Sequence, residues 1–208
     1  MSAAFSAGRD TPRAFLERCL AAVKRHEKSI HAFVTLDPRA ARKAADAATR
    51  RYKAGRPLSP VDGCPIAVKD IIATADMPTQ MNSPIYKGWR PKFDAASVAA
   101  LRQAGAVIVG KTVTTEFAIG RSGPTKNPWD TTRTPGGSSS AAGAMPHATA
   151  AADPLDDPPG VRVVSHGFFV GPDRPIANSV VTVLPTMTAP AWRRAATEAA
   201  SNFGRQPL

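Results

Sequence analysis

The sequence predicts an α/β fold in which a mixed sheet carries helices on its faces. A helical pattern that ends at Gly105 is followed at once by the apolar, β-branched run 106–109. A second apolar run, Ile66 to Val68, is too short for a helix and is typical of a buried strand. Two amphipathic helices precede both runs, and this alternation of helices with short strands is the pattern of an α/β domain.

Two start signals predict the first two helices. Thr11-Pro12 and Asp37-Pro38 each place a capping side chain before a proline in the first helical turn. After the first signal, apolar residues recur at helical spacing to about Lys28. The second helix is rich in alanine and is expected to end at Gly55, because glycine readily adopts the left-handed conformation that terminates helices.

The middle of the chain predicts further strands and one helix. Lys69 would lie at the end of the strand 66–68, and Asp94 is expected to cap the third helix. The strand after that helix is expected to end at Gly110. Residues 112–119 have enough β-branched and aromatic side chains for another extended segment, and 121–135 has the composition of a loop.

The composition changes after Ser140. Every lysine lies at or before Lys126, and prolines become denser in the C-terminal part. We therefore expect an organised part over residues 1–140 and a divergent, proline- and alanine-rich tail over 141–208. Within the tail, short apolar runs predict strands and one segment predicts a helix; the runs are 161–164, 168–170 and 180–184, and the helix is 191–203.

Composition and charge restrict the class of protein. With 208 residues, 43% of them apolar, the chain is long enough for one domain with a buried core. The net charge of +11 attracts phosphates in principle, but the cations are spread along helical patterns with few aromatic residues between them. A solvated basic face is therefore favoured over nucleic-acid binding. No apolar run approaches a membrane span or a signal-peptide core, so we expect a cytoplasmic protein without a membrane partner.

A lysine and a serine cluster carry the most informative chemistry. Lys69 follows a buried-type strand, and Ser138, Ser139 and Ser140 follow a pair of glycines. Singly, such a lysine is usually a surface residue, and a glycine-serine run is usually a flexible turn. Together they suggest serine-lysine chemistry on an amide. The cysteines and histidines show no metal-ligand spacing, and no organic cofactor is implied.

Several unlike segments, in order and content, resemble the amidase signature family. The resemblance covers about residues 10–140, and it rests on Gly63–Asp70, Asp94–Val98, Gly105–Thr112, Glu116-Phe117, Gly123-Pro124, Asn127–Trp129 and Pro135–Ser139. It implies a mixed sheet flanked by helices and an activity that hydrolyses the C–N bond of a small-molecule carboxamide. Members of the family are longer than this chain, so we expect an incomplete, truncated version of the fold.

The resemblance also implies roles for individual residues. Lys69 is similar to the family's base, and Ser138 to a serine that is held by a cis peptide bond and relays a proton. A lysine can act as a base near neutral pH when burial disfavours its charged form. For Asp70 a structural hydrogen-bonding role is favoured over a catalytic one, and Ser139 is expected to form local hydrogen bonds.

The sequence departs from the family at the nucleophile. In the family a second serine follows the first in a Gly-Gly-Ser-like turn, whereas this chain has Gly160 to Val163 at the corresponding distance. No Gly-Gly-Ser turn follows Ser140, and Ser165 and Ser179 lack the required turn residues. The nucleophile is therefore unknown, and we expect this chain to be an impaired amidase. A truncation, a shifted reading frame or an unusual fusion would explain a divergent, poorly ordered tail.

Two other functions remain open. The resemblance is equally compatible with the glutaminase component, the A subunit, of a tRNA-dependent amidotransferase, which releases ammonia from glutamine. From a different class, the chain could be a non-catalytic remnant or a basic binding module in which Lys69 and Ser138 are preserved scaffold. In either case an incomplete sheet leaves an uncovered edge, and such an edge favours self-association.

Overall fold

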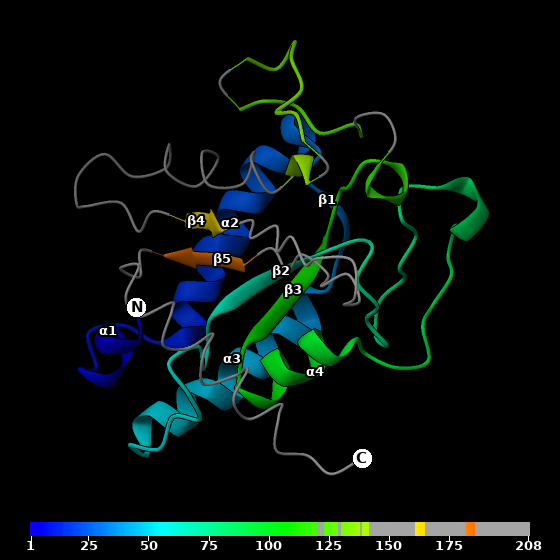
Figure 1. The fold of residues 1–208 in the computed structure, drawn as a ribbon. Helices are drawn as coiled ribbons and strands as arrows, with labels where there is room; N and C mark the ends of the chain where they lie inside the picture. Colours follow the sequence, from blue (N-terminus) through cyan, green and yellow to red (C-terminus); the bar gives the residue numbers. More distant parts are fainter. Residues whose placement is uncertain (120–122, 129, 138, 142–160, 165–181, 186–208) are drawn as a thin grey trace, which may run out of the picture.

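The computed structural model describes residues 1–119, 123–128, 130–137, 139–141, 161–164 and 182–185. Its main sheet has three strands, β1 (Phe33–Leu36), β2 (Pro65–Lys69) and β3 (Val107–Thr112). The strand order is β1-β3-β2, with β1 antiparallel and β2 parallel to the central β3. Figure 1 shows helices packed around this sheet. The predicted mixed α/β fold with flanking helices is therefore confirmed.

Helices α2 (Pro12–Ile30) and α3 (Pro38–Lys53) begin at the two predicted start signals. The side chain of Thr11 accepts a hydrogen bond from Ala14 N, and that of Asp37 accepts one from Ala40 N. Beyond α3, Gly55 adopts the left-handed conformation with a φ of 66°. Local capping chemistry therefore determines both helices. A short helix that the sequence analysis missed, α1 (Ser2–Ser6), precedes them.

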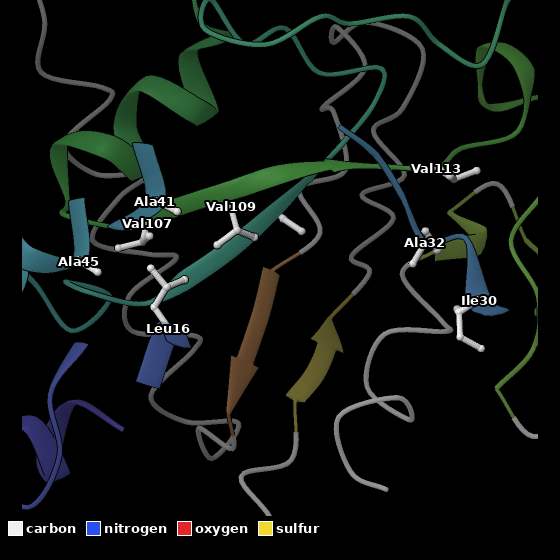
Figure 2. Packing of buried hydrophobic residues seen from close by; sticks show 10 residues of the cluster. Leu16, Ile30, Ala32, Ala41, Ala45, Val107, Val109 and Val113 are labelled. Atoms are coloured by element: carbon white, nitrogen blue, oxygen red, sulfur yellow. The ribbon is translucent and has the colours of Figure 1, made fainter. Parts of the chain in front are cut away.

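The two faces of the sheet are covered by different helices. On one face, Val107 and Val109 of β3 pack with Leu16 of α2 and with alanines of α3, as Figure 2 shows. On the other face, Ile66 and Ile108 belong to a cluster that includes residues of α4 (Ala96–Gln103). Small alanine side chains allow α3 to approach the sheet closely. The strand ends are therefore enclosed between two layers.

Helix α4 exists as predicted, but Asp94 does not cap it. The residue before α4 is Ala95, and no side chain caps the helix. Asp94 instead accepts a hydrogen bond from Ala75 N at 2.8 Å and forms an ion pair with Arg102 at 2.9 Å. Contacts with distant parts of the chain thus compete successfully for this carboxylate.

The strand β3 does not end at Gly110, as the sequence suggested, but continues to Thr112. A side chain at position 110 would collide with the backbone oxygen of Thr35 in β1. The glycine therefore permits the close approach of two strands rather than terminating one of them. The four-residue strand β1 was itself missed, because it lies between two helix signals and is short.

The extended segment predicted over 112–119 is wrong beyond the end of β3. The chain there forms a short 3₁₀ turn, η2 (Glu116–Ala118), in which Phe117 has a φ of 49°. The backbone N–H of Phe117 donates to Met81 O at 3.0 Å. This contact with a loop far away in the sequence holds a conformation that β propensity disfavours.

A separate antiparallel pair consists of β4 (Val161–Val164) and β5 (Thr182–Pro185). The first strand matches the prediction, and the second begins two residues later than predicted. The strand predicted at 168–170 and the helix predicted at 191–203 lie outside the described residues. Among the residues that the structure describes, no helix is both long and apolar enough to span a membrane.

Candidate active site

Lys69 is the last residue of β2, a strand in which every side chain is buried. Only 2% of its surface is exposed. Burial lowers the pKa of the Lys69 amine below its ordinary value, because a charged ammonium loses the solvation that water provides. The position at the end of a buried strand therefore favours the neutral amine that a general base requires.

The neighbouring strand places Thr112 beside Lys69. The two residues are direct partners in the parallel register of β2 and β3, and Asp70 N donates to Thr112 O at 3.0 Å. The hydroxyl of Thr112 is buried and has no hydrogen-bond partner among the described residues. A buried hydroxyl without a partner is costly, so it marks a polar location next to the lysine.

The serine cluster is described only in part. Ser138 lies outside the described residues, so its proximity to Lys69 stays a prediction. Ser140 is buried, and its hydroxyl has no partner among the described residues. Ala141 belongs to the same core cluster as Ala67 and Val113, which are neighbours in sequence of the Lys69–Thr112 pair. The chain directly after the serine cluster thus packs into the core next to the end of β2.

Asp70 is fully buried and forms an ion pair with Lys111. The Oδ1 atom of Asp70 lies 3.1 Å from Lys111 Nζ, and its Oδ2 atom accepts from Gln80 N at 3.1 Å. Burial raises the pKa of Asp70, and the neighbouring ammonium of Lys111 acts in the opposite direction. These contacts give Asp70 a structural environment, whereas a catalytic role for it, like the local bonding expected of Ser139, stays a prediction.

Lys111 is the residue of this region that sequence analysis overlooked. It has no exposed surface, although it carries an ammonium. Besides its pair with Asp70, it donates to Ile72 O at 2.8 Å and to Thr79 Oγ1 at 2.6 Å. Its signal in the sequence was its position inside the buried run of β3, where an unpaired charge would be very unfavourable.

The loop after β2 is held against Asp70. The backbone N–H of Met81 donates to Asp70 O at 3.0 Å. Met81 and Asn82 have φ angles of 55° and 51°, which are uncommon for residues other than glycine. The hydrogen bonds around Asp70 and Lys111 therefore fix an irregular turn immediately beyond Lys69. Among the described residues, no three His, Cys, Asp or Glu side chains are grouped as a metal site would require.

Comparison with known proteins agrees with this geometry. The amidase family model matches residues 14–151, and the chain belongs to this family of amidase signature proteins. The family predicted from the sequence motifs is thus confirmed.

Curated relatives share one function by name, as the A subunit of a glutamyl-tRNA(Gln) amidotransferase. The chain is 45% identical over 143 residues to the protein of this name from Rhodopirellula baltica, and 48% identical over 143 residues to that from Chloroflexus aurantiacus. The two alignments include 63% and 66% of this chain. The chain spans only 29% of the length of each of these relatives.

Solved structures give a similar result. A protein from a vestigial complex, described as revealing the evolutionary origins of an s-triazine catabolic enzyme, is 36% identical with a TM-score of 0.66. The peptide amidase of Stenotrophomonas maltophilia is 31% identical with a TM-score of 0.63. Each match covers 70% of this chain but only about a third of the solved one, 33% and 32%.

Proposed function

We propose that this chain carries the base and the relay serine of a carboxamide-hydrolysing site. Lys69 is the base, and Ser138 passes a proton between it and a nucleophile. The observation that carries this proposal is the position of Lys69, which is buried at the end of β2 with a lowered pKa. A neutral amine there can accept a proton near neutral pH, whereas an exposed ammonium could not.

The proposal includes an impairment of the 208-residue chain. Attack on a carboxamide carbonyl requires a nucleophile that forms an acyl intermediate, followed by release of ammonia or an amine and hydrolysis by water. No Gly-Gly-Ser turn follows Ser140 in the sequence. Such a turn would supply both the serine and backbone N–H groups for the oxyanion, and loss of one oxyanion donor alone costs roughly 100- to 1000-fold in rate.

A fluorophosphonate probe tests both parts. Because the nucleophile is missing, we expect the folded chain to show no labelling above that of Lys69→Ala, and no hydrolysis of simple aliphatic or aromatic amides. Labelling that disappears in both Lys69→Ala and Ser138→Ala would support their roles and contradict the impairment. Labelling that persists in Lys69→Ala would contradict the role of Lys69 itself.

The names of the curated relatives favour a second candidate function. Relatives at 45% and 48% identity are A subunits of an amidotransferase, so the carboxamide would be glutamine. This function predicts that the chain binds glutamine in preference to aliphatic amides and retains partner subunits in a pull-down. Binding of aliphatic or aromatic amides without partner subunits would favour a stand-alone amidase. Failure of all three would favour the non-catalytic remnant.

A further inference from the structure

A groove between α2 and α3 collects cations that are dispersed along the sequence. It is a hollow of about 410 Å³ on the opposite side of α3 from the alanines that pack on the sheet. Its lining consists of five cations and a single carboxylate, and the residues are Arg13, Arg39, Arg42, Lys43, Asp46 and Arg50. Sequence spacing alone indicated only a solvated basic face.

Two of the five cations are neutralised within the protein. Arg13 forms ion pairs with Glu17 at 2.8 Å and with Asp46 at 2.7 Å. Arg42 pairs with Glu17 at 2.8 Å. These contacts bridge α2 and α3, so they fix the spacing of the two helices on either side of the groove. Their role is structural, because neither carboxylate has charge left for a further partner.

The other three cations have no such partner. Arg39, Lys43 and Arg50 are exposed, and within the described part of the chain none of them forms an ion pair or a side-chain hydrogen bond. They follow one another at helical spacing along one side of α3. At 1.5 Å per residue the row is about 16 Å long. Three uncompensated charges therefore form a line on a rigid helix.

We propose that this groove binds a nucleic-acid duplex through its phosphate backbone. A duplex strand presents one phosphate per about 3.4 Å of its axis, so the row spans about five phosphates. A single inorganic phosphate is too small to contact all three cations. Arginine predominates in the lining, and its guanidinium matches the geometry of phosphate oxygens.

The lining also argues against other anionic partners. No apolar side chain lines the groove, whereas a helix that binds a membrane surface inserts apolar residues into it. The lining has no aromatic residue on which unpaired bases could stack. It is also far more charged than the centre of a protein interface. Binding through the backbone of a duplex is the remaining mode, and it does not depend on the catalytic proposal.

The test uses the full chain and a fluorescent 20-base-pair RNA duplex, with anisotropy measured between about 50 and 200 mM salt. We expect micromolar binding at the lowest salt and a logarithmic salt slope of about −2 to −3, since each phosphate contact contributes about −0.9. The triple variant Arg39→Gln, Lys43→Gln, Arg50→Gln should bind at least about tenfold more weakly with a nearly flat slope. Glutamine keeps helix propensity, and circular dichroism checks the fold.

A matched control removes the same charge elsewhere. Lys87, Lys92 and Lys126 are exposed and lie outside α2 and α3, so the triple glutamine variant at these positions should change binding less than twofold. Equal weakening by both triple variants would overturn the proposal in favour of diffuse charge. Three other results would overturn it too: no binding at the lowest salt, full displacement by low-millimolar inorganic phosphate, and binding to anionic phosphatidylserine vesicles but not to the duplex.

Discussion

The carboxylate of Asp70 lies 3.1 Å from the ammonium of Lys111, and neither side chain is exposed to solvent. This pair joins the turn after β2 to the end of β3. It also lies directly beyond Lys69 in sequence, so the backbone that follows the candidate base is fixed by a buried charge interaction. The energetic consequence of such a pair is asymmetric, because removing one partner leaves the other charge buried and uncompensated.

We therefore predict a strong destabilisation when one partner is removed. Lys111→Met should lower the free energy of unfolding by about 3 to 5 kcal/mol in urea titrations. The double variant with Asp70→Asn should lose less than the sum of the two single losses, since the uncompensated charge is gone. Strict additivity would contradict the pairing. As a control, Arg133→Gln removes an exposed ion pair with Asp130 and should change stability little.

The lowered pKa of Lys69 predicts a pH-dependent stability. Above the ordinary value of 10.5 the amine is neutral in both states and costs nothing. As the pH falls below 10.5, the unfolded chain binds the proton before the folded one does, so the folded state loses stability. Lys69→Met removes this penalty, and its stability advantage over the wild type should be larger at about pH 8 than at about pH 10.5.

The comparison requires a substitution that has no titrating group. Leu16→Ala serves here, because Leu16 is fully buried and its truncation costs about 2 to 5 kcal/mol. This loss should be the same at both pH values. An advantage of Lys69→Met that shrinks as the pH falls would contradict a buried, neutral-favouring environment for the amine.

Gly105 is expected to be irreplaceable, for a steric reason. It has a φ of 90°, and an added Cβ would collide with the Asp62 carboxylate. That carboxylate is held by Arg51 Nε and by Leu58 N, each at 2.9 Å, and cannot move aside. Gly105→Ala should therefore lower the free energy of unfolding by on the order of 3 kcal/mol.

Gly55 provides the matched control for this prediction. It also has a positive φ, 66°, but nothing lies within 4 Å of an added Cβ. Gly55→Ala should cost only the backbone strain of about 1 to 2 kcal/mol. Thermal unfolding of the two variants side by side separates strain from collision, and equal losses would show that the collision is relieved.

Features set by neighbouring residues were predictable from the sequence, and those set by distant contacts were not. Thr11 and Asp37 cap their helices as expected, because the partner N–H lies three residues away. Asp94 has the same chemistry, yet an ion pair with Arg102 and a bond from Ala75 occupy it.

The candidate site shows the same division. The burial of Lys69 followed from the short apolar run before it, because a strand of that kind lies inside a sheet. The pairing of Lys111 with Asp70 did not follow, because it depends on the register of β2 against β3. Likewise, the groove cations appeared dispersed until α2 and α3 were packed together.

The most direct test of the catalytic proposal is an NMR titration of the Lys69 side-chain nitrogen, assigned with Lys69→Met. The proposal predicts that this amine loses its proton at a lower pH than the ordinary value of 10.5, and that Ser138→Ala alters the titration while Ser29→Ala, on the distant exposed end of α2, does not. An amine that titrates at 10.5 or above, unaffected by Ser138→Ala, would contradict the proposal.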